Sequence, residues 1–201
     1  MHDGKGAHES FQRRTRLNPH RLVLKISQDE IRKRIHALAA QIRNDYRGKD
    51  LLLVGVLKGA FIFLADLVRS LDLPVEVDFI RIASYGASTA SSGGITLSKD
   101  LECTIDGRDV LVVEDIVDTG VTMQWLMAHL QCRHPQSVKI CALIDKYERR
   151  TVEVPVHYIG FRIPSGFVVG YGLDFAEKYR GLQGIYEVVF DAIEGSHAGQ
   201  L

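Results

Sequence analysis

Nearly continuous apolar runs alternate along the chain with segments whose apolar residues recur at helical spacing. The runs at 51–57 (LLLVGVL), 109–113 and 138–144 are typical of strands that are covered on both faces of a sheet. The segments at 61–71 and 123–133 have helical periodicity instead. Strands that alternate with helices are joined by right-handed crossovers. The pattern therefore predicts an α/β fold with a mostly parallel twisted sheet flanked by helices.

A further helix is predicted before the first of these strands. Ser27 and Glu30 have the spacing of a capping box, in which each side chain bonds the other residue's backbone amide. Apolar residues then fall at helical spacing up to about Tyr46, and Gly48 is expected to close the helix. These apolar positions are Ile31, Ile35, Leu38 and Ile42.

Length and organisation favour one domain. The chain has 201 residues, with no internal repeat and no proline-rich linker that we can find. We expect the domain to span residues 26–191, after a flexible polar and basic tail at 1–25 and before a short tail at 192–201. The remaining short strands are predicted at 75–82, 156–161, 167–169 and 186–190.

The charges of the chain balance, with 25 Lys and Arg against 25 Asp and Glu. A protein that grips nucleic acid through its phosphates needs a surplus of positive charge, so the balance argues against a nucleic-acid partner. Because no net charge keeps copies apart, the balance weakly favours an oligomer. The apolar share of 46% is ordinary for a globular protein and argues against wholesale disorder.

The cysteines and the apolar stretches indicate a cytoplasmic protein. Cys103, Cys132 and Cys141 lack CxxC spacing and cannot all pair, which favours a reducing compartment over a disulfide framework. No stretch of about 18 apolar residues is present, so we expect no contact with a membrane. The polar N-terminus lacks the apolar core of a signal peptide.

One long segment, 84–99, breaks the alternation of strands and helices. It is rich in serine and glycine and has few apolar residues to anchor it (SYGASTASSGGITLSK). Loops of this length in a globular domain are usually either functional lids or disordered, and composition alone does not separate the two.

The candidate chemistry is concentrated in the run at 110–123 (VLVVEDIVDTGVTM). Its apolar strand ends in the adjacent acids Glu114 and Asp115, and residues 118–122 lead into a helix. Ligands bind at the carboxyl ends of the strands in an open parallel sheet. There the acids can accept hydrogen bonds from hydroxyls or hold a metal ion. The backbone amides of the turn can bind a phosphate at a helix N-terminus. A phosphorylated sugar suits this arrangement.

Other interpretations of this run carry less weight. Asp118 and Thr122 can simply cap the helix, which we would favour for an isolated Asp-Thr-Gly but not beside two further acids. Aspartic proteases also use Asp-Thr-Gly, but they are all-β and need a second copy. A nucleotide-binding Walker B strand would need a phosphate-binding loop of the form GxxxxGK[ST], which is lacking.

A metal site at His129, Cys132 and His134 is also disfavoured, because their spacing cannot place all three on one face of a helix.

The run at 110–123 resembles the phosphoribosyl pyrophosphate-binding signature of the type I phosphoribosyltransferases. From about residue 26 to 191 the chain is similar to their 6-oxopurine branch, which acts on hypoxanthine and guanine. Several separated motifs carry this resemblance in the right order. They are 57–60 (LKGA), Ser84-Tyr85, the signature itself, Lys146, and 167–174 (FVVGYGLD) with Arg180 beyond it.

The resemblance implies roles for the signature. Glu114 and Asp115 would hold the 2- and 3-hydroxyls of the ribose, directly and through Mg²⁺. Asp118 would lie beside N7 of the purine as the general base. The residues that would bind the 5-phosphate are Thr119, Gly120, Val121 and Thr122.

It also implies a pyrophosphate site. The backbone amides around Lys58 and Gly59 would meet the leaving group, in a loop where the family has a cis peptide between Leu57 and Lys58. Arg180 would clamp the pyrophosphate, and Asp174 would take a second Mg²⁺. The alternative for Lys58 is a solvated loop lysine, which its position alone favours less.

The purine would bind under a small hood built from N-terminal and C-terminal segments, with its elements at 146–185. Lys146 would donate to the 6-oxo oxygen, Phe167 would stack on the base, and backbone groups near Val168 would read its edge. Without the resemblance, Lys146 is one exposed charge among several and Phe167 is a core residue. The resemblance also makes Ser84 and Tyr85 the start of a mobile lid over residues 84–99.

The implied reaction joins a 6-oxopurine to phosphoribosyl pyrophosphate, giving the nucleoside 5-monophosphate and pyrophosphate in a homodimer or homotetramer. Two other functions stay open. One is a regulator of the same fold that senses nucleotides and binds nucleic acid, and the balanced charge speaks against it. The other is the same chemistry on uracil, orotate or adenine, against which Lys146 and the 167–174 motif speak. The choice among hypoxanthine, guanine and xanthine is not readable from the sequence.

Overall fold

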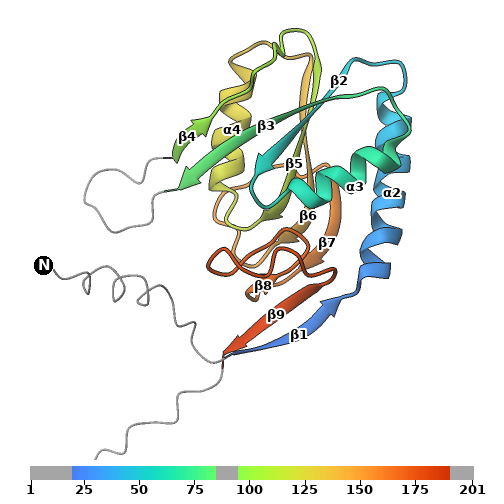
Figure 1. Ribbon diagram of the computed structural model, residues 1–201. Coiled ribbons are helices and arrows are strands. Elements are labelled where there is room, and N and C mark those ends of the chain that lie inside the picture. Colours follow the sequence, from blue (N-terminus) through green and yellow to red (C-terminus); the bar gives the residue numbers. More distant parts are fainter. Residues whose placement is uncertain (1–19, 85–94, 191–201) are drawn as a thin grey trace, which may run out of the picture.

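The computed structural model describes residues 20–84 and 95–190, which build a large and a small β-sheet and three helices (Figure 1). The large sheet has six strands in the order β4-β3-β2-β5-β6-β7, and the small sheet has three in the order β1-β9-β8. The strands and helices in chain order are β1 (His20–Ile26), α2 (Gln28–Tyr46), β2 (Leu51–Leu57), α3 (Phe61–Leu71), β3 (Glu76–Ser84), β4 (Ile95–Lys99), β5 (Asp109–Val117), α4 (Val121–Gln131), β6 (Ser137–Lys146), β7 (Tyr158–Ile163), β8 (Val168–Val169) and β9 (Ile185–Phe190).

The large sheet is parallel except at one edge, which confirms the predicted fold class. Strands β3, β2, β5, β6 and β7 run parallel, and the edge strand β4 pairs antiparallel with β3. Helix α3 provides the crossover from β2 to β3 and helix α4 the crossover from β5 to β6, whereas β3 is joined to β5 through β4. The carboxyl ends of the parallel strands therefore meet along one edge of the sheet.

The central strands are apolar throughout because both faces of the sheet are covered. In β2, Leu51 and Leu53 belong to one buried cluster, whereas Leu52, Val54 and Val56 belong to the other. This alternation follows from the two-residue period of a strand. Helices α2 and α3 lie on one face and α4 on the other (Figure 1).

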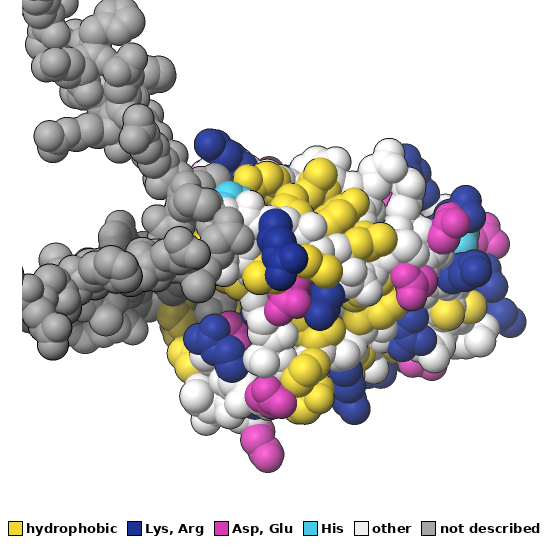
Figure 2. Space-filling view, turned by 90° about the horizontal axis from the view of Figure 1, so that it is seen from below, with side chains coloured by type: hydrophobic (Ala, Val, Ile, Leu, Met, Phe, Trp, Pro, Cys, Tyr) yellow, Lys and Arg dark blue, Asp and Glu magenta, His cyan; other side chains and the backbone are white. Residues whose placement is uncertain are grey.

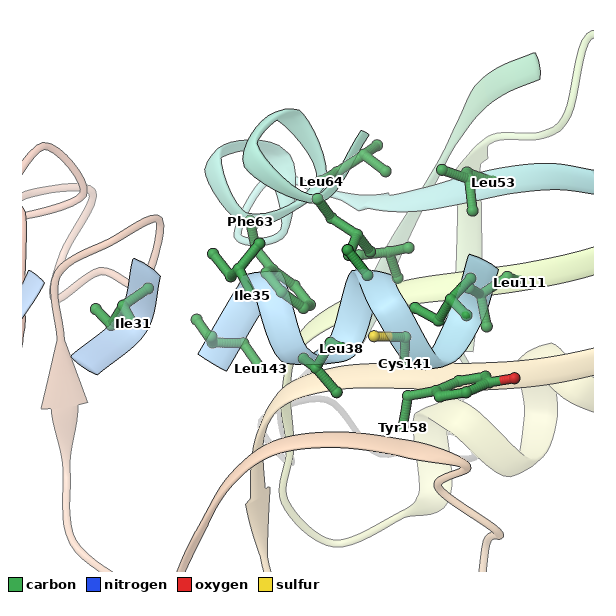
Figure 3. Close-up of a cluster of buried hydrophobic side chains, with 14 of the residues drawn as sticks. Ile31, Ile35, Leu38, Leu53, Phe63, Leu64, Leu111, Cys141, Leu143 and Tyr158 are labelled. Atoms are coloured by element: carbon green, nitrogen blue, oxygen red, sulfur yellow. The ribbon is translucent and has the colours of Figure 1, made fainter. Parts of the chain in front are cut away.

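The core under α2 and α3 joins the helices to the middle of the sheet (Figure 3). Leu38 of α2 and Phe63 of α3 are fully buried there, with Leu111 of β5 and Leu143 of β6. At about 25 cal/mol for each Å² of apolar surface, burial of one such side chain contributes about 2 kcal/mol.

The capping box of α2 is confirmed. The Ser27 hydroxyl accepts from the Glu30 amide at 3.3 Å, and the Glu30 carboxylate accepts from the Ser27 amide at 2.8 Å. The helix ends at Tyr46, as predicted, and its predicted apolar positions are all buried. None of the described helices is long and apolar enough to cross a membrane.

The small sheet corresponds to the hood and corrects the predicted tail. Residues 20–25, where we expected a tail, belong to strand β1, which pairs antiparallel with β9 from His20↔Phe190 to Ile26↔Ile185. Apolar and polar residues alternate only weakly in β1, and Val23 and Leu24 stay exposed. Its extended conformation therefore depends on pairing with β9, which is far away in the sequence. Seen from below, this end of the molecule carries hydrophobic side chains among both signs of charge (Figure 2).

Two further predicted boundaries change. Residues 95–99 of the expected lid form strand β4 instead, because they pair with the end of β3. The lid prediction otherwise falls on residues 85–94, including Tyr85, which lie outside the described part of the chain. Strand β5 continues to Val117 rather than ending at Val113, because β6 pairs with it as far as Val117↔Asp145.

Candidate active site

Three loops meet at the carboxyl edge of the large sheet. Strand β2 ends at Leu57, and parallel pairing with β5 brings the residues that follow it beside Glu114 and Asp115. Strand β6 ends at Lys146 on the other side of β5. The sequence motifs that follow these strands are thus neighbours in space.

The two acids of β5 differ in their surroundings. Glu114 is buried, and its carboxylate accepts from the backbone amide of Asp115 at 3.1 Å. Burial, together with the neighbouring charge of Asp115, raises the pKa of Glu114 well above its ordinary value. Asp115 accepts from the amide of Ile116 at 2.8 Å. A second negative charge on this pair is therefore costly unless hydroxyl donors or a cation offset it.

Gly59 allows the loop after β2 to approach this pair. A Cβ atom on Gly59 would lie 1.6 Å from Oδ2 of Asp115, so no other residue fits without displacing the carboxylate. The peptide bond between Leu57 and Lys58 is cis. Gly172 packs against the other side of the loop, where its own Cβ would lie 2.1 Å from the Gly59 carbonyl oxygen. Its φ of +100° is one that L side chains rarely adopt.

The turn between β5 and α4 forms one wall of a cavity of about 250 Å³. Gly120 has a φ of +90°, and a Cβ there would lie 2.3 Å from the Val152 carbonyl oxygen. The turn is held by the Thr119 carbonyl, which accepts from the amides of Thr151 at 3.0 Å and Val152 at 3.1 Å. Predicted site residues that line the cavity are Gly59, Glu114, Asp115, Asp118, Thr119, Gly120 and Thr122.

The residues Asp118 and Thr122 do not cap helix α4. Its N-cap is Gly120, without a side-chain hydrogen bond to the first turn. The capping interpretation is therefore wrong. Val121 is the first residue of the helix and is exposed.

Asp118 retains an unused acceptor. Its Oδ2 lies 3.4 Å from an Arg149 guanidinium nitrogen. Its Oδ1 is buried and has no hydrogen-bond partner in the described part of the chain. A buried carboxylate oxygen without a donor is costly and uncommon in proteins. At the wall of a cavity, it is suited to accept a proton or hydrogen bond from a ligand.

Lys146 is buried at the end of β6, so the exposed interpretation of this lysine is wrong. Burial lowers its pKa, and the nearby negative charge of Asp118 partly offsets that effect. Its Nζ can donate up to three hydrogen bonds.

Arg150 links the two sides of the site, and the sequence motifs do not include it. Its Nε donates to the Asp118 carbonyl at 3.1 Å, and its Nη2 donates to the Lys146 carbonyl at 3.3 Å. The same nitrogen bonds the buried carboxylate of Asp145. One guanidinium thus fixes the turn after β5 against the end of β6.

A second cluster of charges lies where the loop after β2 meets the 174–180 segment. Arg180 bonds Asp174 at 2.8 Å and Glu177 at 3.2 Å, and Lys58 bonds the same Glu177 oxygen at 2.9 Å. The hydrogen bonds from Lys58 and Arg180 lower the pKa of Glu177. Arg180 also donates to the Gly172 carbonyl at 2.8 Å. Lys58, Asp174 and Arg180 are thus brought together by Glu177.

The 167–169 segment lies in the hood. Phe167 is 44% exposed, so it is not a core residue, whereas Val168 is buried in β8. The Phe167 ring meets Phe175 edge to face, with centroids 5.3 Å apart. Its exposed surface can stack on a planar ligand.

The three acids expected to hold metal are not gathered into one cluster. Asp174 bonds Arg180, whereas Glu114 and Asp115 lie together on β5. In the described ranges no three His, Cys, Asp or Glu side chains form a group that could hold a metal ion. Ser84 is the last residue of β3.

Sequence reasoning missed Arg149, Arg150, Gly172 and Glu177. The two arginines stand in a run of mostly charged residues, DKYERR, which gives no sign that Arg150 is partly buried. Gly172 and Glu177 lie within or beside the 167–174 motif. Their closeness in sequence to Asp174 is the signal that could have identified Gly172 and Glu177 as site residues.

The phosphoribosyl transferase domain model matches residues 27–176. A hypoxanthine-guanine phosphoribosyltransferase of Dictyostelium discoideum is 51% identical over 160 residues, covering 78% of this chain and 89% of the relative. One of Mycobacterium avium is 48% identical over 163 residues, covering 78% and 80%.

Solved structures with the same fold bear similar names. The hypoxanthine-guanine phosphoribosyltransferase from Bacillus anthracis, with a HEPES molecule in its active site, has a TM-score of 0.79 and 44% identity. That match covers 83% of this chain and 98% of the other. Hypoxanthine phosphoribosyltransferase from Trypanosoma cruzi, in complex with the product IMP, has a TM-score of 0.76 and 39% identity, covering 87% and 96%.

Proposed function

The chain belongs to the phosphoribosyl transferase domain family, and from that premise we propose how its residues carry out the reaction. It is a glycosyltransferase of purine salvage. It transfers the 5-phosphoribosyl group of phosphoribosyl pyrophosphate to N9 of hypoxanthine or guanine. The bond between C1 of the ribose and the pyrophosphate oxygen breaks, the bond from C1 to N9 forms, and a purine proton is released.

The cavity at the end of β5 carries this assignment to residues. Its wall combines the carboxylates of Glu114 and Asp115 with the backbone amides at the start of α4. Glu114 and Asp115 accept hydrogen bonds from the ribose hydroxyls. The amides from Thr119 to Thr122 bind the 5-phosphate, since a helix N-terminus favours negative charge.

Asp118 accepts the proton that the purine loses. Its Oδ1 lies buried at the cavity wall and has no hydrogen-bond partner among the described residues, so it can accept from a ligand. A base in this position lowers the barrier because positive charge does not accumulate on the purine as N9 attacks. The carboxylates of Glu114 and Asp115, beside the ribose, offset the positive charge that develops on the sugar.

Lys146 and Phe167 recognise the base. The Nζ of the buried Lys146 donates a hydrogen bond to the 6-oxo oxygen. A purine with an amino group at position 6 could not accept this hydrogen bond. Phe167 stacks on the purine ring with its exposed surface. Backbone groups near Val168 bond the edge of the base.

Lys58, Gly59 and Arg180 bind the pyrophosphate. The two cations offset charge that the leaving oxygen acquires, and the Gly59 amide donates to a phosphate oxygen. Arg180 is preorganised by its bond to the Gly172 carbonyl.

Mg²⁺ fits the acids of the site. Hard oxygen ligands suit this ion, and it is usually held by one or two carboxylates together with substrate phosphates. The mutual repulsion of Glu114 and Asp115 is relieved by a divalent cation. Asp174 is the candidate for a second ion. When bound, Mg²⁺ neutralises charge on the pyrophosphate.

We also propose that the enzyme works in the cytoplasm as a homodimer or homotetramer. All three cysteines carry free thiols, as a reducing compartment would maintain them.

A panel of bases tests the proposed substrates. Hypoxanthine, guanine, xanthine, adenine, uracil and orotate are each incubated with phosphoribosyl pyrophosphate and Mg²⁺, and product nucleotide is measured. We expect turnover with hypoxanthine or guanine, and at least about 10²-fold less with adenine, which would leave the Lys146 donor unpaired. Comparable turnover of adenine would contradict the role of Lys146.

A further inference from the structure

Glu177 places its carboxylate between the two cations assigned to pyrophosphate. One oxygen, Oε2, lies 2.9 Å from Nζ of Lys58 and 3.2 Å from Nη2 of Arg180. These cations come from segments more than a hundred residues apart, and the carboxylate is the group that joins them. The mechanism above gives Glu177 no task.

The backbone that carries Glu177 is strained. Phe175 and Lys178 exchange two backbone hydrogen bonds of 3.1 Å, which makes Ala176 and Glu177 the central residues of a tight turn. Both have positive φ, 51° and 63°, as in a type I′ turn. Such turns favour glycine and asparagine, and alanine or glutamate adopts them at a cost. Backbone strain of this kind clusters at ligand-binding sites and persists where the surroundings impose it.

The surroundings of the turn do impose it. The Glu177 amide donates to Asp174 at 2.8 Å. Phe175 is packed edge-on between the rings of His20 of β1, Phe167 and Phe190, with centroids 5.6, 5.3 and 5.7 Å away. The hood thus fixes the Phe175 end of the turn, and Asp174 holds the Glu177 amide. The Glu177 side chain itself is 64% exposed, so it can swing into solvent without breaking the core.

We propose that Glu177 acts as a built-in competitor of pyrophosphate, its carboxylate occupying the phosphate position between Lys58 and Arg180 until substrate displaces it. A carboxylate and a phosphate oxygen accept the same hydrogen bonds from lysine and arginine, so the two cannot share these donors fully. This inference rests on the proposed function of Lys58 and Arg180.

Two consequences follow for the reaction. Before substrate binds, the carboxylate pairs with both cations and offsets the repulsion between them. After transfer, it competes for the same donors and so favours release of pyrophosphate. The affinity of the enzyme for pyrophosphate is therefore lower than that of the same site without the Glu177 carboxylate.

The test measures binding of inorganic pyrophosphate with excess Mg²⁺ by calorimetry, and product inhibition by pyrophosphate in the steady state. Glu177→Gln keeps the shape of the side chain and removes its charge. We expect it to bind pyrophosphate roughly 3- to 10-fold more tightly, the range for one or two exposed ion pairs. Glu177→Gly should do the same while also relieving the strained φ, so its melting temperature should not fall.

Three further variants make the result decisive. Lys58→Gln and Arg180→Gln should weaken pyrophosphate binding, and Asp72→Asn should leave it unchanged. Asp72 is an exposed acid at the C-cap of α3, where its φ of 52° suits asparagine. If the cation variants bind more weakly but both Glu177 variants bind no more tightly than wild type, the competitor role is wrong. If neither cation variant changes binding, the assignment of the pyrophosphate site itself is wrong.

Discussion

The backbone of Gly59 lies directly against the carboxylate of Asp115, so that a Cβ atom on Gly59 would stand 1.6 Å from Oδ2. These residues come from the loop after β2 and from β5, two neighbouring parallel strands. The contact joins Gly59, which we propose binds pyrophosphate, to Asp115, which we propose binds the ribose. One backbone contact thus fixes the separation of the proposed pyrophosphate and ribose subsites.

We expect Gly59→Ala to abolish most of the activity while the protein still folds. The methyl group must displace Asp115, and an error of about 1 Å in a reacting geometry can cost about 10²-fold in rate. Overpacking typically costs about 1–3 kcal/mol of stability, so the variant should still unfold cooperatively.

Gly181→Ala is the matched control, because a Cβ there meets nothing within 4 Å. Its kcat/KM should equal that of wild type. Wild-type kcat/KM in Gly59→Ala would show that the contact with Asp115 does not matter for catalysis.

Arg150 is expected to position the site rather than touch substrate. It holds the Asp118 and Lys146 carbonyls and the buried Asp145 carboxylate. Removing one partner of a buried ion pair typically costs about 3–5 kcal/mol, so Arg150→Met should lower the free energy of unfolding by roughly that amount. Arg150→Lys keeps the charge but loses the planar set of N–H donors of the guanidinium.

The kinetics of the Arg150→Lys variant separate positioning from simple stability. At a temperature where the variant is fully folded, kcat/KM for the purine should fall by at least about tenfold. The reason is that Lys146 and Asp118 are no longer held in place by the same guanidinium. Arg162→Ala is the control: Arg162 also faces Asp145, at 3.5 Å, but is 67% exposed, so its loss should cost about 1 kcal/mol or less. Unchanged kcat/KM in Arg150→Lys would remove Arg150 from the positioning of the site.

Most of the large sheet could be predicted from the sequence because its central strands are covered on both faces. A run such as LLLVGVL is typical of a strand in the middle of a covered sheet. The strands predicted at 51–57 and 138–144 match β2 and β6 to within two residues at either end. Strands β1 and β4 were missed for the opposite reason. They lie at sheet edges and are half exposed, so their conformation depends on partners far away in the chain or beyond a long loop.

The site shows the same division. Residues near one another in sequence, such as Glu114, Asp115 and Asp118, could be placed at one ligand site because one strand and one turn carry them. The contacts of Gly172 with Gly59 and of Arg150 with Asp118 cross between loops. Such contacts depend on tertiary packing, for which a local pattern contains no signal.

Acid should destabilise the protein through Asp78. Burial alone would raise the pKa of this carboxylate, but hydrogen bonds from the amides of Phe79, Glu102 and Cys103 and from the Cys103 thiol outweigh it and lower the pKa to about 2. A pKa that is lower in the folded state adds stability above the unfolded pKa of 3.8. That stability is lost as the pH falls from about 4 to about 2.

Urea unfolding of Asp78→Asn against wild type measures this contribution. The wild type should be more stable by roughly 2 kcal/mol at pH 7, and the difference should shrink below pH 4. Asp72→Asn, at an acid that is 89% exposed, should differ little from wild type at either pH. A difference for Asp78→Asn that stays constant from pH 7 to pH 3 would contradict the ionised role of Asp78.

Chelation of divalent metal should stop turnover. Glu114 and Asp115 line the proposed site of a substrate with three phosphate groups, and Mg²⁺ would offset the negative charge that binding brings together there. We expect excess EDTA to abolish product formation, excess Mg²⁺ to restore it, and the melting temperature without substrate to change little. Full activity in excess EDTA would show that the reaction proceeds without the ion.

The most direct measurement of the whole account is the kcat of Asp118→Asn. Asparagine keeps the shape of the side chain but cannot take a proton, whereas the binding of phosphoribosyl pyrophosphate rests on other residues. We predict that kcat falls by about 10²–10⁴-fold, the usual contribution of a positioned general base. The melting temperature and the calorimetric affinity for phosphoribosyl pyrophosphate with Mg²⁺ should stay close to wild type. A kcat near that of wild type would contradict the proposed mechanism, because Asp118 would then not be the group that accepts the purine proton.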